Sequence, residues 1–361
     1  MNILWLSWRD IKNPAAGGAE KVAIEVAKRF VRDNSSVTIF TSSFEKAKSQ
    51  EKVSGVNIIR KGNQLTCRLH AFLYYRKNPD FNVVIDEINT IPFFTNFYAK
   101  SKSIALIHQL ARQYWFSNLP QPLSTIGFIL ENLYLMLYKD MLTITVSKST
   151  EKDLKALGFK NIKIIREGLN FKPYTPTIKS NQLLFLGRLT KVKGPNQAIL
   201  AYNLIHQKLP NYRLIIAGSG KYLKSLKKLV KNFKLTSKIT FTGHVNETKK
   251  IKILRNSKII LIPSIREGWG LVAIEAMSQG CVPIAYNVPG LKDSIINNRT
   301  GILTEKTPET LADSAIKILT NNSLAGKLAK NGVEHSKKYS WDNTYLEVNK
   351  VLGDKFLKVS H

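Results

Sequence analysis

The sequence predicts an α/β protein made of two Rossmann-like domains, each built around a parallel sheet. Three observations support this fold class: short apolar runs alternate with longer amphipathic segments, the alternation lapses once near the middle of the chain, and it then begins again. Strands interleaved with helices are typical of βαβ units, in which helices cover both faces of a parallel sheet. The length of 361 residues also suits two domains of roughly 100–200 residues each.

The N-terminal domain is expected at residues 1–172. Its first strand, Ile3–Ser7, runs into a glycine-rich loop and then into an amphipathic helix from about Ala19 to Arg32. Further strands are expected at Val37–Thr41, Asn57–Arg60, Val83–Asp86, Ile104–His108 and Met141–Val146.

A hinge and a second domain are expected next, with the domain at residues 173–340. Residues 170–182 read N-F-K-P-Y-T-P-T-I-K-S-N-Q, a polar segment with two prolines that is typical of a linker. The strands that follow are expected at Leu183–Leu186, Tyr212–Ala217, Ile239–Thr242, Ile259–Ile262 and Val282–Ala285. Residues 341–361 are expected to form a C-terminal helix, which is a candidate to pack back on the N-terminal domain.

Composition excludes several classes of protein. The two cysteines, Cys67 and Cys281, lie far apart, which argues against a disulfide framework, and no zinc-binding motif such as H-E-x-x-H or C-x-x-C occurs. No uninterrupted apolar run is long enough to span a membrane, and the N-terminus does not have the pattern of a signal peptide. We therefore expect a soluble, cytoplasmic chain that needs no metal.

The formal charge of +30 leaves several partners open. Nucleic acid, an anionic membrane surface and phosphate-bearing substrates would each attract such a chain, and lysine-rich solvated faces would explain the charge without any partner. Because the aromatic signatures of nucleic-acid modules are missing, we expect no nucleic-acid partner. A membrane surface stays open, which would make the protein peripheral on the inner face of the cell membrane.

The first loop reads Gly17-Gly18-Ala19-Glu20 and opens a helix directly after the first strand. Two glycines at this place would let backbone N–H groups face a phosphate, or they would simply turn the chain from strand to helix. The loop lacks G-x-G-x-x-G, and no acidic residue ends the second strand, so a dinucleotide site is disfavoured.

His108 ends the fifth predicted strand, where open α/β sheets bind ligands. A structural role for this single histidine is the alternative. In the second domain, residues 187–194 read G-R-L-T-K-V-K-G, in which Arg188 and Lys193 could neutralise phosphate oxygens without a metal. A solvated basic loop is the alternative there.

Residues 267–275, E-G-W-G-L-V-A-I-E, are the most informative segment. Gly268 and Gly270 would let the backbone approach a ligand, and the helix beginning at Leu271 would offer N–H groups to a phosphate. Glu267 and Glu275 could each accept hydrogen bonds from sugar hydroxyls. A phosphate seat between two such carboxylates suits a nucleotide-sugar.

Other loops and helices are less specific. Gly218-Ser219-Gly220 and Gly243-His244-Val245 are glycine loops at strand ends, and each could be no more than a tight turn. The amphipathic segment 221–234 has a lysine-rich face, and the segment 113–138 is poor in charge. Either segment could contact a membrane, and helix packing on a core is the alternative for both.

Taken together, these motifs resemble the retaining glycosyltransferases of family 4, which adopt the GT-B fold. The motifs that carry the resemblance are, in order, G-G-A-E at 17–20, His108, G-R-L-x-K-x-K-G at 187–194 and E-G-W-G-L-V-A-I-E-A at 267–276. The last of these fits the E-x7-E pattern of that family. The likeness covers essentially the whole chain.

The resemblance implies two facing Rossmann-like domains that bind a nucleotide-sugar in a cleft, mainly through the C-terminal domain. It implies a catalytic set of His108 near the donor sugar, Glu267 on the sugar hydroxyls, and Arg188 and Lys193 on the diphosphate. Further donor-binding residues would be Gly17 and Gly18 near the diphosphate, Gly268, Gly270 and Leu271 at the phosphate seat, Glu275 on the ribose and Val245 near the base.

We therefore expect a retaining hexosyltransferase that needs no cofactor and uses a nucleotide-diphosphate sugar, with a UDP-hexose favoured. The expected acceptor is a glycan, a polyprenol-linked sugar or a glycolipid. A nucleotide-sugar epimerase of the same architecture and a non-enzymatic basic nucleic-acid binder are the rival functions. An epimerase would need a cluster of acid and base residues facing the sugar, and His108 is the one candidate.

Overall fold

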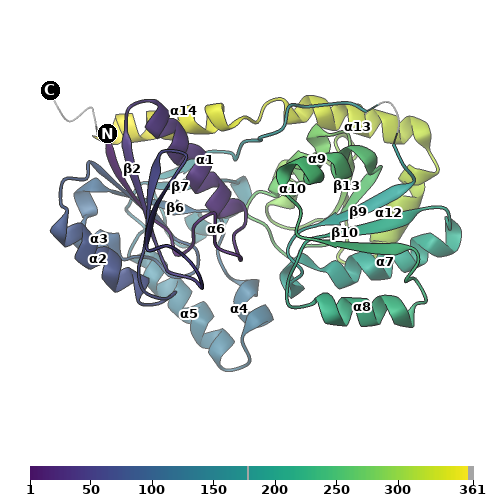
Figure 1. Ribbon diagram of the computed structural model, residues 1–361, viewed down its shortest axis with the longest axis horizontal. Helices are drawn as coiled ribbons and strands as arrows, with labels where there is room; N and C mark the ends of the chain where they lie inside the picture. Colours follow the sequence, from purple (N-terminus) through teal and green to yellow (C-terminus); the bar gives the residue numbers. More distant parts are fainter. Residues whose placement is uncertain (177–178, 357–361) are drawn as a thin grey trace. The chain divides into compact units, whose positions relative to one another are not determined.

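The computed structural model describes residues 1–176 and 179–356, which form two compact units (Figure 1). The N-terminal unit comprises Met1–Gly168 together with the chain from Tyr339 onward, and the C-terminal unit comprises Leu169–Lys338. The sequence placed these boundaries at residues 172 and 340. Residues 177–178 of the predicted linker and 357–361 of the predicted last helix lie outside the described residues.

The N-terminal unit is built on one eight-stranded sheet with the order β3-β4-β2-β1-β5-β6-β7-β8. Its strands are β1 (Asn2–Leu6), β2 (Ser36–Thr41), β3 (Gln50–Val53), β4 (Val56–Arg60), β5 (Val83–Glu87), β6 (Ser103–Ile107), β7 (Thr143–Thr145) and β8 (Ile162–Ile164). The central strands are almost completely buried, as expected for a sheet whose two faces are covered.

The parallel sheet predicted for this unit has one antiparallel edge strand, which the sequence analysis missed. Strand β3 pairs antiparallel with β4 across the turn at Ser54 and Gly55, where φ is 51° and 85°. Two successive residues with positive φ form the tight turns that suit two-residue hairpins. Strand β3 is polar and largely exposed, so it has no apolar run that predicts a strand.

Six helices and a short 3-10 turn connect these strands, and a seventh helix comes from the end of the chain (Figure 1). They are α1 (Gly18–Arg32), α2 (Cys67–Lys77), α3 (Thr95–Tyr98), η1 (Lys100–Lys102), α4 (Gln113–Asn118), α5 (Leu123–Met136), α6 (Lys148–Ala156) and α14 (Trp341–Phe356).

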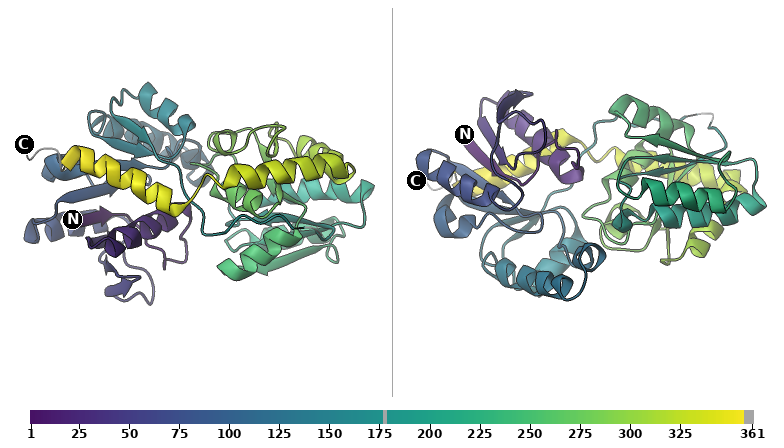
Figure 2. Two further views of the ribbon diagram at one scale, coloured as in Figure 1. Left: turned by 90° about the horizontal axis from the view of Figure 1, so that it is seen from above. Right: turned by 60° about the horizontal axis from the view of Figure 1, so that its bottom comes forward.

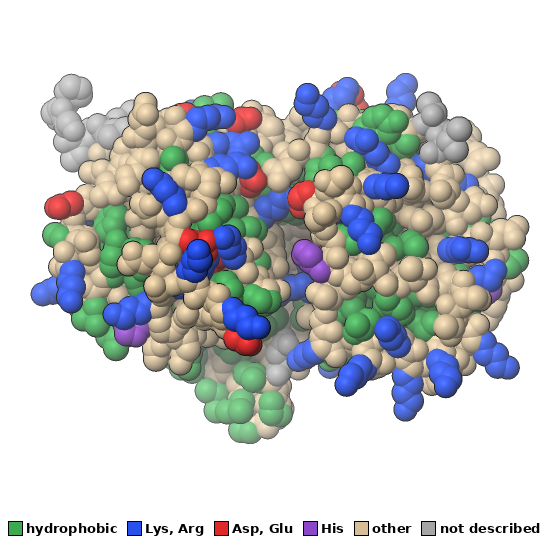
Figure 3. All heavy atoms as spheres, in the orientation of Figure 1, with side chains coloured by type: hydrophobic (Ala, Val, Ile, Leu, Met, Phe, Trp, Pro, Cys, Tyr) green, Lys and Arg blue, Asp and Glu red, His purple; other side chains and the backbone are tan. Residues whose placement is uncertain are grey.

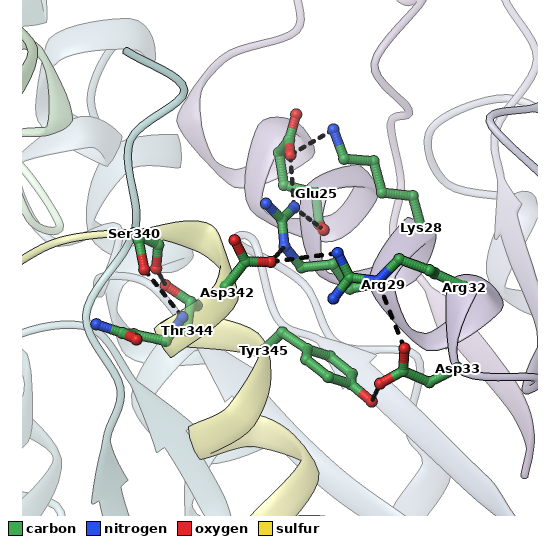
Figure 4. A network of polar contacts seen from close by, with 10 residues as sticks. Glu25, Lys28, Arg29, Arg32, Asp33, Ser340, Asp342, Thr344 and Tyr345 are labelled. Atoms are coloured by element: carbon green, nitrogen blue, oxygen red, sulfur yellow. Dashed lines mark hydrogen bonds and ion pairs between the residues drawn. The ribbon is translucent and has the colours of Figure 1, made fainter. Parts of the chain in front are cut away.

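Helix α14 returns to the N-terminal unit and lies beside α1 (Figure 2). Arg29 donates to Asp342 at 2.8 Å, and the Tyr345 hydroxyl donates to Asp33 at 2.6 Å (Figure 4). The Tyr345 ring packs edge-on against Phe30 with 4.8 Å between the ring centroids. The last helix is therefore part of the N-terminal core rather than an appendage.

The C-terminal unit has a six-stranded, fully parallel sheet with the order β11-β10-β9-β12-β13-β14. Its strands are β9 (Gln182–Leu186), β10 (Arg213–Ala217), β11 (Ile239–Gly243), β12 (Ile259–Ile262), β13 (Val282–Tyr286) and β14 (Ile302–Thr304). Its helices are η2 (Lys191–Lys193), α7 (Pro195–Lys208), α8 (Leu223–Asn232), α9 (Glu247–Asn256), α10 (Leu271–Ser278), α11 (Leu291–Ser294), α12 (Pro308–Leu319) and α13 (Asn322–Ser336).

The α/β fold class with two Rossmann-like sheets and a C-terminal helix is thereby confirmed. Helix α8 buries Leu226 and Val230, as the core-packing alternative for segment 221–234 expected. Among the described residues, no helix is both long enough and apolar enough to cross a membrane.

We expect the buried face of α14 to contribute to the stability of the N-terminal unit. Leu352 is fully buried and Leu346 is exposed on the same helix, so one substitution can be compared at two depths. Leu352→Ala should lower the free energy of unfolding by about 2–5 kcal/mol, because it leaves a cavity. Leu346→Ala should change it by less than about 0.5 kcal/mol.

Scanning calorimetry would measure both variants, with the transition of the C-terminal unit as an internal reference. Equal effects of the two substitutions would show that α14 is not held in this way.

Candidate functional site

The order of the C-terminal sheet opens a crevice between β9 and β12. Chain connections leave these two strands toward opposite ends of the sheet, and ligands of open α/β proteins bind outside the carboxyl ends of strands at such a point. The loop after β9 carries Arg188 and Lys193, and the loop after β12 carries Glu267. Strand order alone therefore brings together two motifs that are distant in sequence.

Lys193 and Glu267 form an ion pair across this point. The Lys193 Nζ lies 2.6 Å from both carboxylate oxygens of Glu267. The Glu267 side chain is 11 % exposed and that of Lys193 is 24 % exposed, so the pair is mostly shielded from water. The predicted diphosphate-binding cation thus neutralises the predicted sugar-binding carboxylate.

Two glycines allow the loops around this pair to approach closely. A Cβ on Gly194 would lie 2.4 Å from the Pro263 carbonyl oxygen, and a Cβ on Gly290 would lie 2.3 Å from that of Glu267. Both residues also have positive φ, of 65° and 83°. Glycine is needed at each position because any side chain would separate the backbone segments.

Glu275 is neutralised in the same manner by a different helix. Its side chain is 7 % exposed on α10, and its Oε1 lies 2.8 Å from the Nζ of Lys250 on α9. Lys250 also lies 2.8 Å from Glu247, which is half exposed. A buried carboxylate is costly unless it is paired, so Lys250 is part of the arrangement that holds Glu275 in place.

Helix α10 begins at Leu271, shortly after Glu267 in the chain. Gly270 precedes its first residue, Leu271, with φ of 83°, which turns the chain sharply into the helix. The first N–H groups of a helix have no partner within it and attract anions. Gly268 lies in the same turn, between Glu267 and the start of the helix.

The remaining predicted residues of this unit lie on neighbouring loops. Arg188 is exposed and forms no ion pair within the described part of the chain. Its loop contacts Gly218 and Gly220, where an added Cβ would come within 1.9 and 2.5 Å of backbone oxygens. Close packing of the loop after β10 on the loop after β9 therefore explains the glycines at positions 218 and 220. Val245 is half buried after β11, at the outer strand of the sheet.

The glycine loop of the N-terminal unit is held by a buried carboxylate. Glu20 accepts the Gly17 N–H at 2.6 Å and the Arg9 guanidinium at 2.8 Å. The Gly17 N–H is therefore occupied within the protein. Gly18 opens α1, and a Cβ at that position would lie 3.9 Å from an oxygen of Glu167.

His108 lies between two glutamates in the same unit. Its Nδ1 is 3.2 Å from Glu167 and its Nε2 is 3.6 Å from Glu87, and all three side chains are buried. Glu87 also accepts the indole N–H of Trp5 at 2.7 Å. Glu167 therefore connects His108 with the loop that contains Gly18.

These carboxylates control the charge of His108. Burial by itself would lower the pKa of the imidazole, but the hydrogen bond to Glu167 and the negative charges of Glu167 and Glu87 outweigh burial and raise that pKa to about 10. The imidazole is therefore a cation at neutral pH, and it can only donate hydrogen bonds in that form.

The sequence analysis did not identify Glu87, Glu167 or Lys250. Only the structure identifies these three residues, because each contacts a predicted site residue that lies at least 21 positions away in the chain. A glutamate at the end of strand β5 was the one available signal. In the described parts of the chain, no group of three His, Cys, Asp or Glu side chains is placed to hold a metal ion.

Comparison with known proteins identifies the family. Residues 169–335, which lie in the C-terminal unit, match the model of the family described as glycosyl transferases group 1. An uncharacterized glycosyltransferase of Methanocaldococcus jannaschii is 29 % identical over 239 residues, which are 60 % of this chain and 61 % of that protein. The chain thus spans less than two thirds of the length of this relative.

Solved structures agree in fold. Sucrose-phosphate synthase from Thermosynechococcus elongatus superposes with a TM-score of 0.83 at 20 % identity over 99 % of both chains. Anabaena HepE in complex with UDP-glucose gives a TM-score of 0.76 at 18 % identity, over 98 % of this chain and all of that one. The family resemblance predicted from the motifs is confirmed: residues 169–335 match the glycosyl transferases group 1, and the chain has the GT-B fold.

Proposed function

We propose that the protein is a retaining hexosyltransferase. It would transfer a hexose from a nucleotide-diphosphate sugar, with UDP as the favoured nucleotide, to a hydroxyl of a glycan, a polyprenol-linked sugar or a glycolipid. The observation that carries this proposal is the pair of buried carboxylates, Glu267 and Glu275, which lie on either side of the turn that begins α10. Each carboxylate is neutralised by a lysine.

The donor contacts follow from the chemistry of that site. The diphosphate would lie against the first N–H groups of α10, at Gly270 and Leu271, and would be neutralised by Arg188 and Lys193. Glu267 would bind hydroxyls of the donor sugar, and Glu275 would bind the ribose. Lys193 and Glu267 lie within 2.6 Å of each other, so the diphosphate and the donor sugar would be bound by adjacent groups.

Bond breaking requires stabilisation of the departing diphosphate. The bond between the anomeric carbon and the diphosphate oxygen breaks, and the acceptor oxygen forms a new bond on the same face of the sugar. Negative charge grows on the diphosphate as this happens, and fixed cations stabilise such charge without reorganisation. We assign this role to Arg188 and Lys193, and we assign no covalent nucleophile.

The N-terminal unit would contribute His108, Gly17 and Gly18. The Nδ1 of the cationic imidazole is held by Glu167, whereas Nε2 has no hydrogen-bond partner among the described residues and would donate a hydrogen bond to a sugar hydroxyl. Gly18 would allow the backbone to approach the donor diphosphate. The N-terminal unit would also bind the acceptor, and it would hold the protein at the inner face of the cell membrane.

Thermal stabilisation by a panel of nucleotide-sugars would test the function. A UDP-hexose should raise the melting temperature with EDTA present, because a ligand that binds the folded state stabilises it. Glu275→Ala should weaken donor affinity roughly 10–100-fold by removing a buried hydrogen-bond acceptor. Glu247→Ala is the matched control, since this exposed glutamate contacts the same Lys250, and it should change affinity less than about twofold.

Stabilisation by nucleic acid instead of any nucleotide-sugar would contradict the transferase proposal. Equal donor affinity of the two glutamate variants would contradict the assignment of Glu275 alone.

Lys193→Gln should lower kcat by a factor of roughly 10²–10³, because it removes charge that stabilises the departing diphosphate. The control is Lys191→Gln, in the same 3-10 turn, where the lysine is exposed. Initial-rate measurements over a range of donor concentrations would separate kcat from KM. A change in KM alone would limit Lys193 to ground-state binding of the donor.

His108 should remain protonated at about pH 8, since its pKa is raised from 6.5 to about 10. Because folding raises this pKa, the stabilisation is fully present below about pH 6.5 and is lost as the pH rises through about 10. NMR of the imidazole nitrogens would report the charge. His206, whose pKa is lowered by burial and by Lys238, should be neutral at the same pH, and a neutral His108 there would refute the proposed ion pairs.

A further inference from the structure

Helix α5 has its polarity reversed relative to an ordinary surface helix. Its buried residues are Ser124, Gly127, Glu131 and Leu135, whereas its exposed residues are apolar apart from Thr125. The outward side chains of Ile126, Ile129, Leu130, Leu133, Met136 and Leu137 are between 48 and 56 % exposed. Surface helices normally place such residues against the core and polar residues in water. The core-packing alternative for segment 113–138 is therefore wrong for this face.

Polar contacts on the inner side hold the helix in this orientation. Glu131 accepts hydrogen bonds from the N–H groups of Ala111 and Arg112 and from the indole of Trp115. Gly127 contacts the Trp115 ring so closely that a Cβ would lie 2.4 Å from it. The contacts on the inner side seat α5 against the segment that contains α4, and the outward apolar side chains take no part in them.

The outward face forms one continuous surface, which we call the α4–α5 face. Helix α5 has 14 residues and is therefore about 21 Å long. Tyr114 and Phe116 of α4 and Leu119 after it are also exposed. Figure 3 shows hydrophobic side chains gathered over the tip where α4 and α5 meet. Contiguous apolar surface of this kind marks a site of interaction, in contrast to scattered apolar residues.

The charges around this face are positive. Between residues 113 and 138, Glu131 is the one charged residue, and it is buried. Beyond the C-terminal end of α5, Lys160 pairs with Asp140 at 2.8 Å. The positive charges of Lys139 and Lys100 also lower the pKa of Asp140. Three lysines thus surround a single acidic group at the border of the face.

We propose that the α4–α5 face docks on an anionic lipid bilayer. Its apolar side chains would enter the boundary between headgroups and acyl chains, and the bordering lysines would contact anionic headgroups. A second copy of the chain is the less suitable occupant, because it would bring the same lysines against each other. The inference names the surface of the N-terminal unit for the peripheral membrane position proposed above. It does not rest on the proposed transfer reaction.

Vesicle flotation tests the inference. The protein should float with vesicles of equimolar phosphatidylglycerol and phosphatidylcholine, and less with vesicles of phosphatidylcholine alone. The double variant Leu130→Gln/Leu133→Gln should bind on the order of tenfold or more weakly, since two apolar side chains would no longer be buried. The matched control, Ile296→Gln/Leu346→Gln, changes two exposed apolar residues elsewhere and should bind like the wild type.

Both double variants should keep the melting temperature of the wild type, because all four positions are exposed. Failure of the wild type to float at low salt would overturn the inference, as would equal flotation of the two double variants. Light scattering gives a separate check: a wild-type dimer that Leu130→Gln/Leu133→Gln converts to a monomer would assign the face to a second copy. Donor-induced thermal stabilisation should be the same in all of these proteins.

Discussion

The C-terminal site depends on how the fold neutralises two carboxylates that it removes from water. Glu267 and Glu275 lie on either side of one turn, and an unpaired buried carboxylate would be unstable there. Lys193 from the loop after β9 and Lys250 from α9 supply the opposite charges. The positions of η2, α9 and α10 are therefore linked by electrostatics as well as by packing.

The N-terminal unit uses the reverse arrangement, in which two carboxylates hold one potential cation. His108 would be neutral if burial acted alone, but Glu87 and Glu167 raise its pKa well into the alkaline range. Glu87 is the last residue of β5 and Glu167 lies in the segment after β8, so the charge of the imidazole depends on the correct assembly of the sheet. In both units, chemistry that involves charge is thus coupled to tertiary structure.

Helix α5 shows what an amphipathic pattern leaves undecided. Its sequence is apolar on most sides and has one carboxylate, which is compatible with a buried helix or with an interfacial one. The decisive contact is made by Glu131, which binds backbone N–H groups at Ala111 and Arg112 and thereby turns the apolar face outward. The same orientation of α5 therefore both forms this polar contact and exposes the apolar surface.

The sequence by itself determined most of the βα order, the two sheets, and the E-x7-E segment with its glycines, because local patterns of apolar residues and glycine specify strands, helices and turns. It did not reveal three edge strands: β3, which is polar and held by its turn, and the short strands β8 and β14. Tertiary structure decided which charges meet: Lys193 with Glu267, Lys250 with Glu275, and His108 with Glu87 and Glu167. These partners are separated by between 21 and 74 positions, and the order of strands in a sheet, which no local pattern encodes, is what brings their opposite charges within 4 Å of each other.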